Sequence, residues 1–191
     1  MSERRRAGAS REAFVRATGE LLRSQGYGAT GLNAIVAASG APKGSLYFHF
    51  PGGKESLAVA ALAREAELLR DALAALLRSS GDLTEAIANV IDALAAGLER
   101  SNFEHGCPLA TVALERATQS EAVRYAAVSG FDSWLEQIEQ RLLAAGMTDA
   151  AAAKKALVLL SAIEGALILA RAHRDVAPLA AVRAELHSIL T

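Results

Sequence analysis

The side chains best suited to chemistry in this chain of 191 residues lie close together in residues 30–57, TGLNAIVAASGAPKGSLYFHFPGGKESL. Lys43 offers a positive charge, and Tyr47 and His49 follow it with hydrogen-bond donors. Side chains of these types bind the phosphate oxygens and base edges of nucleic acids. The small residues Gly44-Ser45 would let a nucleic acid approach the backbone closely. The stretch therefore indicates a nucleic-acid-binding surface.

Two short helices joined by a tight turn are predicted to position these side chains. The first has apolar residues at helical spacing, namely Leu32, Ile35 and Val36. Thr30 precedes them and can cap the helix with its hydroxyl. Gly40 suits the position after a helix C-terminus, because glycine adopts a positive φ with little strain. Pro42 suits the first turn of the next helix, where its missing N–H costs nothing.

The second helix is expected from Lys43 to about His49, and residues 50–53, FPGG, end it. Leu46 and Phe50 are four residues apart and would face inward. Two helices of these lengths with this turn are typical of a helix-turn-helix, whose second helix lies in the DNA major groove. The alternative is a helical hairpin in which the tyrosine and the histidine are ordinary surface residues.

The composition favours an all-helical protein. Hydrophobic residues make up 52% of the chain, alanine and leucine dominate, and β-branched runs are scarce. The net charge of −1 hides an asymmetry, because residues 1–54 hold 8 Lys and Arg against 3 Asp and Glu, whereas residues 55–191 hold 12 against 18. A basic N-terminal part is expected if only that part meets phosphate. The alternative is chance clustering, since Arg4–Arg6 supply three of the positive charges and can be a disordered tail.

Further helices follow from apolar spacing, glycine and proline breaks, and caps. Ser10 is expected to cap a helix that ends at Gly26 and buttresses the helix-turn-helix. Asp82, with Glu85 three residues on, is expected to cap another, and Thr148 a third. We expect the remaining helices over about residues 54–79, 83–100, 109–116, 120–145, 149–173 and 178–190.

Two phrases carry a family resemblance, GAPKGSLYFHFPGGKESL at residues 40–57 and GCPLA at residues 106–110. The first resembles the DNA-binding signature of the tetracycline-repressor (TetR) family, and both are similar to the branch that includes LmrA- and YxaF-type regulators. The resemblance implies an all-α fold of about nine helices. A three-helix helix-turn-helix DNA-binding domain would span residues 1–53, and a helical ligand-binding and dimerisation domain would span residues 54–191. The implied function is a transcriptional repressor that binds a palindromic operator in double-stranded DNA.

The resemblance also divides the DNA contacts between phosphates and bases. The side chains implied to bind phosphates are Thr30, Tyr47, His49 and Lys54. The residues implied to face bases are Asn33, Lys43, Gly44, Ser45 and Phe48. Lys54 stands at the junction of the two domains, where a lysine meets a DNA phosphate in TetR-like proteins.

The helix expected over residues 149–173 is apolar nearly all round from Ala156 to Ala170 and must be covered on most sides. Ser161 and Glu164 interrupt this run, which falls short of the about 20 residues needed to span a bilayer, so we expect no membrane segment. The last helix, about residues 178–190, adds another apolar stripe. The resemblance implies that both helices pack against their copies in a homodimer, with recognition helices about 34 Å apart. The alternative is that both complete a monomeric core.

The resemblance further implies a small-molecule site inside the C-terminal domain. The candidate lining residues are Phe103, His105, Cys107, Trp134, Ile138, Ile163 and Glu164. Trp134 can stack on a ring and orient it through its N–H. Glu164 needs a ligand, Arg141 or Arg171 as a partner, because an unpaired buried charge is costly. The scarcity of polar groups favours a hydrophobic or aromatic effector, whose binding would release the operator by moving the DNA-binding domains apart.

Other interpretations of the same residues stay open. His105 and Cys107 can be a loop cap and a packed thiol, and Trp134 can be a core residue. An enzyme would need a third group to orient a cysteine–histidine pair, and two residues are too few for a metal site, so we expect no catalysis, metal or cofactor. A helical adaptor protein is a further alternative, which the charge asymmetry disfavours. The single cysteine cannot form an intramolecular disulfide, and a cytoplasmic location is expected.

Overall fold

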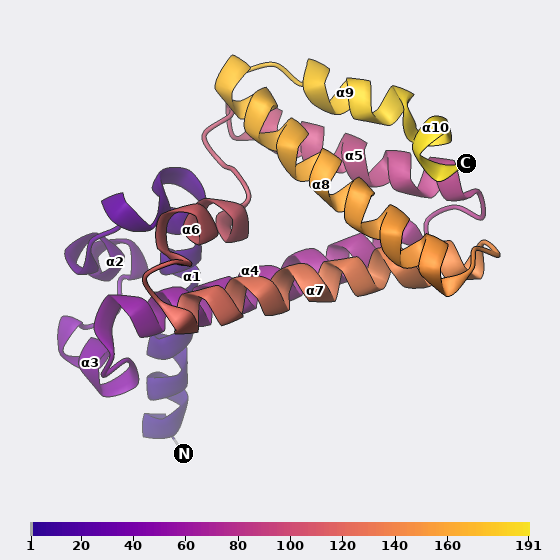
Figure 1. Cartoon of the computed structure of the whole chain (residues 1–191). Coiled ribbons are helices and arrows are strands. Elements are labelled where there is room, and N and C mark those ends of the chain that lie inside the picture. Colours follow the sequence, from indigo (N-terminus) through magenta and orange to yellow (C-terminus); the bar gives the residue numbers. More distant parts are fainter. Residues whose placement is uncertain (1) are drawn as a thin grey trace. The chain divides into compact units, whose positions relative to one another are not determined.

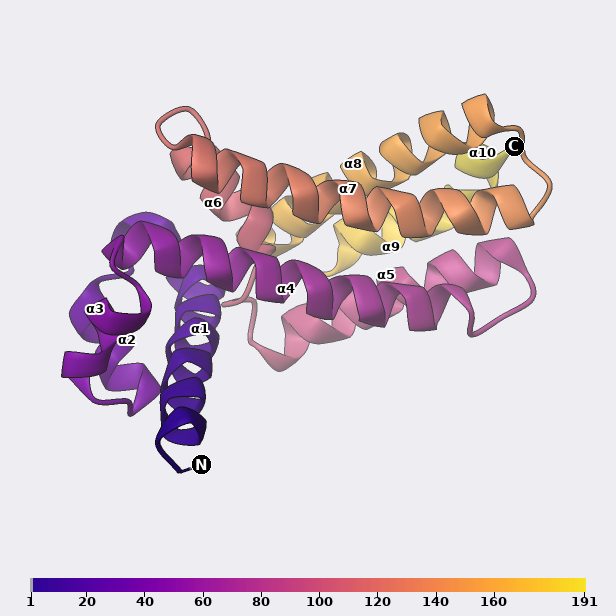
Figure 2. The same cartoon turned by 90° about the horizontal axis from the view of Figure 1, so that it is seen from below.

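The computed structural model describes residues 2–191, with side chains described from residue 8 onward. The described part of the chain forms ten α-helices and one 3-10 helix, and it contains no strand (Figures 1 and 2). The predicted all-α fold is confirmed.

The helices fall into two compact units, which we call the head unit and the body unit. The head unit consists of the residues up to Ala66 together with Pro108–Gly130, and the body unit consists of Glu67–Cys107 and Phe131–Thr191. Packing thus joins a segment from the middle of the chain to the N-terminal helices. The boundary expected after residue 53 divides the chain by function, whereas these units divide it by packing. The functional boundary therefore stays a prediction.

The head unit contains α1 (Ser2–Ala29), α2 (Leu32–Ser39), η1 (Lys43–Ser45), α3 (Leu46–His49) and α6 (Pro108–Arg116). The body unit contains α5 (Leu83–Arg100), α8 (Asp149–His173), α9 (Ala177–Ala184) and α10 (Leu186–Leu190). Two long helices, α4 (Gly53–Leu77) and α7 (Glu121–Ala144), begin in the head unit and end in the body unit.

The core of the head unit forms where apolar residues recur at helical spacing. Phe14 and Leu22 of α1, Ile35 of α2, and Leu46 and Phe50 at the two ends of α3 are each at most 3% exposed. Burying a side chain of this size contributes about 1.5–3 kcal/mol. The predicted inward positions of Leu46 and Phe50 are confirmed.

A buried carboxylate ties α1 to α4 inside this core. Glu65 of α4 is 2% exposed and pairs with Arg23 of α1 and with its neighbour Arg64. Two guanidinium groups thus compensate a charge that would be costly to bury alone. The pairing fixes the helix behind the helix-turn-helix.

The first helix begins earlier than predicted. Ser10 lies inside α1, which starts at Ser2, so the predicted Ser10 cap is wrong. The helical path breaks close to the predicted end, at Gly26, where φ is 75° and ψ is −176°. This backbone conformation requires glycine, and a Cβ at this position would also displace the carboxylate of Glu115. The side chains of Arg4–Arg6 lie outside the described part of the chain.

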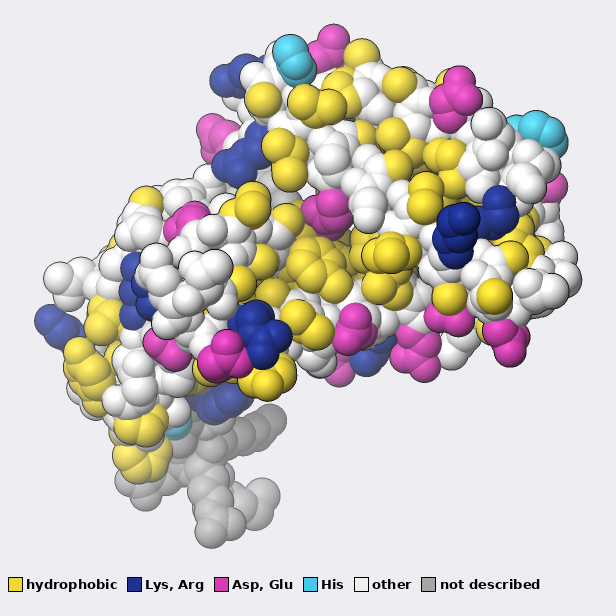
Figure 3. Space-filling view, viewed as in Figure 1, with side chains coloured by type: hydrophobic (Ala, Val, Ile, Leu, Met, Phe, Trp, Pro, Cys, Tyr) yellow, Lys and Arg dark blue, Asp and Glu magenta, His cyan; other side chains and the backbone are white. Residues whose placement is uncertain are grey.

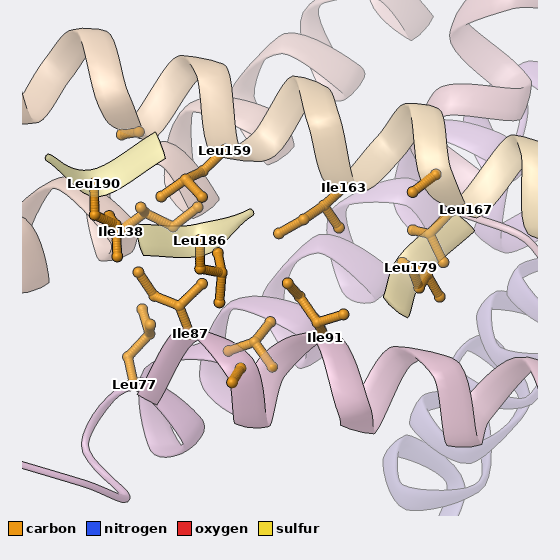
Figure 4. Packing of buried hydrophobic residues seen from close by; sticks show 14 of the residues in the cluster. Leu77, Ile87, Ile91, Ile138, Leu159, Ile163, Leu167, Leu179, Leu186 and Leu190 are labelled. Carbon is orange, nitrogen blue, oxygen red and sulfur yellow. The ribbon is translucent and has the colours of Figure 1, made fainter. Parts of the chain in front are cut away.

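The core of the body unit gathers along one side of α8. Leu159, Ile163 and Leu167 of α8 pack with Ile87 and Ile91 of α5 (Figure 4). Leucines of α9 and α10 add to the same cluster. One side of α8 is therefore covered within the chain.

The predicted caps of α5 and α8 are confirmed, whereas the last predicted helix is not continuous. Asp82 accepts a hydrogen bond from the Glu85 N–H at 2.8 Å, and Thr148 Oγ1 accepts one from the N–H of residue 151 at 3.4 Å. The helix expected over residues 178–190 is divided into α9 and α10 at Glu185, where φ is −88° and ψ is 2°. Neither glycine nor proline marks this break, so apolar spacing alone did not reveal it.

Candidate nucleic-acid interface

α2 and the η1–α3 segment form the predicted helix-turn-helix. α2 ends at Gly40, whose φ of 63° lies in the left-handed region, as predicted. The chain then turns through Pro42, which is extended with φ −61° and ψ 127°. The second helix covers Lys43–His49 as predicted, but its first turn is a tighter 3-10 turn.

The outward side of this second helix carries most of the residues predicted to face bases. Lys43 and Gly44 are exposed, and Tyr47 and Phe48 are 59% and 79% exposed. Lys43 Nζ lies 3.5 Å from Asn33 Oδ1 of α2, so the structure brings these two candidates together. Figure 3 shows hydrophobic side chains at the surface where α3 lies.

Ser45 and His49 are half-buried and already engaged within the head unit. Ser45 Oγ donates a hydrogen bond to the carbonyl of Pro42 at 2.8 Å. The His49 ring packs edge-on against Phe48 and Phe50, with centroid separations of 5.0 and 6.4 Å. Their part in DNA contact remains a prediction.

Thr30 does not fit its predicted roles. Its side chain is fully buried, and its hydroxyl donates to the carbonyl of Gly26 at 2.6 Å. The N-cap of α2 is Gly31, and no side chain caps this helix. Thr30 therefore secures the turn before α2 from inside. We drop it from the predicted phosphate contacts, because none of its side-chain surface is accessible.

Lys54, the predicted phosphate contact at the start of α4, rests against the turn between α1 and α2. Its Nζ lies 4.1 Å from the ring centroid of Tyr27 and 3.4 Å from the carbonyl oxygen of Gly28. Burial lowers the pKa of the Lys54 amine; the charge of Glu115 opposes this effect, and that of Arg116 adds to it. These contacts fix the ammonium group beside the helix-turn-helix.

Glu115 of α6 braces the same turn, and the sequence analysis missed it. The N–H of Gly28 donates to Glu115 Oε2 at 2.5 Å. The neighbouring Arg116 guanidinium lies 4.9 Å from the ring centroid of Tyr27. Gly28 and Glu115 are 87 residues apart in the chain, and no local pattern signals a contact at such a separation. α6 therefore belongs to the structure that supports the helix-turn-helix.

Comparison with known proteins identifies both parts of the chain. Residues 14–61 match the family described as bacterial regulatory proteins, tetR family. Residues 84–185 match the C-terminal domain of LmrA/YxaF-like transcriptional regulators. The chain belongs to the TetR family. Its helix-turn-helix, Leu32–His49, falls within the first match.

Similar TetR-family proteins span nearly the whole chain. It is 35% identical over 172 residues to the HTH-type transcriptional regulator LmrA of Bacillus subtilis (strain 168), covering 90% of this chain and 92% of that protein. It is 36% identical over 172 residues to the HTH-type regulator YxaF of the same organism, covering 90% of each. A TetR transcriptional regulator from Legionella pneumophila has a crystal structure with TM-score 0.83 and 23% identity, covering 94% of this chain and 96% of that chain. This chain is thus a TetR-family transcriptional regulator with a DNA-binding helix-turn-helix, and the resemblance to the LmrA/YxaF branch is confirmed.

The residues proposed to line an effector site of this TetR-family regulator all lie in the body unit. Ile138 and Ile163 are 5% and 6% exposed in its core, and Phe103 packs against that core. Trp134 is 3% exposed, and its ring meets Phe131 edge-on at a centroid separation of 5.5 Å. Such burial suits a core residue as well as a ligand contact, so the lining role remains a prediction.

Cys107 and Glu164 are brought together in this unit. Burial raises the pKa of the Glu164 carboxyl, and the hydrogen bond from the Cys107 thiol lowers it by less. Glu164 Oε2 is enclosed and has no hydrogen-bond partner among the described residues. Arg141, one of the expected partners, donates instead to the carbonyls of Leu77 and Gly81. An acceptor without a partner in a mostly apolar region indicates a place for a hydrogen-bond donor.

His105 lies with Cys107 in the loop between α5 and α6. Its side chain is half-buried, and its backbone N–H donates to Ser101 Oγ at 3.3 Å. Phe103, earlier in this loop, has a positive φ of 62°. Arg171 of α8 donates to the carbonyl of Glu104 at 2.8 Å and so holds the loop against the helix.

α8 has a second apolar side that remains exposed. Leu157, Val158, Ile168 and Leu169 are 56%, 46%, 53% and 52% exposed, and Figure 3 shows hydrophobic side chains at the surface along this helix. Of the described helices, α8 alone is long and apolar enough to cross a membrane. The core helix of a soluble protein meets the same criterion of length and composition.

Proposed function

We propose that this TetR-family regulator is a repressor that binds a palindromic operator as a homodimer and releases it when a hydrophobic or aromatic effector binds the body unit. The observation that carries DNA recognition is the outward face of the second helix, where Lys43, Gly44, Tyr47 and Phe48 are exposed. In a helix-turn-helix this face enters the major groove. We assign base contacts to Asn33, Lys43, Gly44, Ser45 and Phe48, and phosphate contacts to Tyr47, His49 and Lys54.

The exposed side of α8 supports the homodimer. Its apolar side chains lie on both sides of Ser161 and Gly165, two small exposed residues that would let a partner helix approach closely. α9 contributes a further small-residue face of exposed alanines, Ala177, Ala180, Ala181 and Ala184. A two-fold axis at these helices would present two second helices about 34 Å apart, one turn of DNA, to a palindromic site.

The unpartnered oxygen of Glu164 supports effector binding in the body unit. An apolar molecule with one hydrogen-bond donor would satisfy this oxygen. α6 begins at Pro108, directly after Cys107, and carries Glu115 against the turn before α2. A displacement of Cys107 would therefore be passed along the chain to α6. An effector that favours a different placement of α6 would shift the population away from the DNA-binding form. We place this activity in the cytoplasm.

Selection of bound fragments from a random DNA pool tests the proposed function. We expect a palindromic site whose half-sites are about one helical turn apart. Binding should weaken steeply with salt, because phosphate contacts release counterions. Failure to recover a site, or binding insensitive to salt, would contradict operator recognition. A screen of hydrophobic compounds for loss of operator binding then tests the effector.

Substitution of Lys43 tests the assigned face. Lys43→Ala removes one base contact from each half-site. Since each contact is worth about 1–3 kcal/mol, operator binding by the homodimer should weaken at least about thirtyfold, and melting and oligomeric state should stay unchanged. Arg78→Ala, which removes an exposed positive charge of the body unit away from α8 and α9, is the matched control. Equal operator affinity for Lys43→Ala and wild type would show that the base contacts lie elsewhere.

A further inference from the structure

Phe48 is an aromatic side chain that the fold of the protomer does not use. It is 79% exposed, whereas Leu46 at the start of α3 and Phe50 directly after its end are 1% and 3% exposed. An exposed phenylalanine forgoes most of the free energy that burial of its ring would contribute. The helix therefore obtains its packing from Leu46 and Phe50, and Phe48 is available for contact with another molecule.

The surroundings of Phe48 present its ring as a defined apolar surface. Gly44 lies four residues earlier in the second helix, and a Cβ added there would meet nothing within 4 Å. No side chain at Gly44 therefore stands between the Phe48 ring and a molecule approaching this helix. The ring of His49 packs edge-on against Phe48 with centroids 5.0 Å apart, which limits the orientations of the phenylalanine ring.

The exposed polar side chains of this helix-turn-helix include those assigned to DNA. Lys43 Nζ of the second helix lies 3.5 Å from Asn33 Oδ1 of α2, and Tyr47 next to Phe48 is 59% exposed. If the outward face of the second helix enters the major groove, the Phe48 ring faces base edges. A phenyl ring neither donates nor accepts a strong hydrogen bond, so it cannot read the donor and acceptor pattern of the bases. The thymine 5-methyl group is the one apolar group that the four base pairs display in the major groove.

We propose that Phe48 is a specificity-determining residue that recognises thymine in each operator half-site through contact with its 5-methyl group. This inference rests on the proposed operator binding. It accounts for the retention of an exposed phenylalanine beside a lysine and an asparagine. Lys43 and Asn33 would select bases by hydrogen bonds, and Phe48 would add a base preference that hydrogen bonds do not supply.

Replacement of single thymines by deoxyuridine in the selected operator tests the contact, because it removes only the methyl group. Wild-type protein should bind about fourfold more weakly when one particular thymine in one half-site is replaced, the loss expected for one buried methyl. For Phe48→Ala the same replacement should cost nothing. The two changes then form a double-mutant cycle, in which a non-additive loss of affinity shows that the methyl group and the ring interact.

Three outcomes would overturn the proposal. The selected half-site could lack a required thymine, no deoxyuridine replacement could weaken binding by wild type, or the loss could be equal for wild type and Phe48→Ala. Tyr47→Phe removes a hydroxyl assigned to phosphate and should weaken binding. It should not change the ratio of the affinities for the thymine-containing and the deoxyuridine-containing operators. Leu114→Ala removes a side chain of α6 that is 81% exposed and should change neither affinity nor ratio. If no operator is recovered, the proposed function fails; if one is recovered without this coupling, only the role of Phe48 fails.

Discussion

Glu164 is a carboxyl group whose surroundings determine when it is charged. Burial raises its pKa, and one of its oxygens has no hydrogen-bond partner among the described residues. A pKa above the unfolded value means that folding favours the protonated form. This contribution to stability is fully present below the ordinary glutamate pKa of about 4.3 and is lost as the pH rises through the raised pKa.

Glu164→Gln should remove this pH dependence, because the amide stays neutral while it keeps the size of the side chain and an acceptor for the Cys107 thiol. We expect the variant to gain stability relative to wild type as the pH rises from 4 to 8. Urea unfolding at several pH values measures the difference. Glu99→Gln, at an exposed position of α5, should follow the wild-type profile. If Glu164→Gln also runs parallel to wild type, the protonation state of Glu164 does not contribute to stability as described.

The placement of single residues on the helix-turn-helix could largely be predicted from the sequence. Leu46 and Phe50 are four residues apart and therefore share the buried face, which leaves Tyr47 and Phe48 outside. Thr30 could not be placed in the same way. A cap depends on which residue has the extended backbone before the first helical turn, and that residue is Gly31, so Thr30 is turned inward.

α6 is the element through which the middle of the chain reaches the helix-turn-helix. Glu115 accepts the Gly28 N–H at 2.5 Å, and Lys54 Nζ lies 3.4 Å from the carbonyl oxygen of the same residue. The turn before α2 is thus held by a negative charge from one helix and a positive charge from another. The position of α6 should therefore influence both the start of α2 and the phosphate contact proposed for Lys54.

Glu115→Ala should loosen this turn. A hydrogen bond to a charged group contributes about 1.5–3 kcal/mol, and about half of that is expected here because Gly28 is exposed and water can replace the carboxylate. Hydrogen exchange at the Gly28 amide should accelerate and the melting temperature should fall by several degrees. Glu121→Ala breaks only an exposed ion pair with Arg124 and serves as the control, since such pairs contribute about 0.2–1 kcal/mol. Unchanged exchange at Gly28 would mean that the brace is not formed in solution.

Elements could be predicted where their signals are local. α8 was predicted with its bounds, Asp149–His173, because an N-cap threonine and the extent of the apolar run define them. The brace by Glu115 could not be predicted, because it joins residues that only the folded chain brings together. The break at Glu185 between α9 and α10 was missed because the apolar spacing continues through it.

α8 has two apolar sides, and the single chain covers one of them. Leu159, Ile163 and Leu167 face the core of the body unit, whereas Leu157 and Ile168 remain more than half exposed. Exposed side chains of this kind, gathered on one helix face, mark an interaction surface. The length and composition of α8 alone would also allow a membrane segment, so the oligomeric state in solution decides between a protein partner and a lipid environment.

Ile168→Glu should prevent the proposed homodimer without unfolding the protomer. Ile168 is 53% exposed in the single chain, so a glutamate there stays solvated in a monomer, whereas an unpaired charge buried at an interface costs about 3–5 kcal/mol. We expect sedimentation to show a dimer for wild type and a monomer for the variant, with the same helical content. Loss of the dimer should also lower operator affinity, because the two half-sites are then bound by independent monomers. Leu114→Glu, at an exposed position of the head unit, should remain dimeric. A dimeric Ile168→Glu would place the interface on another face, and a monomeric wild type would leave a palindromic operator without a symmetric partner.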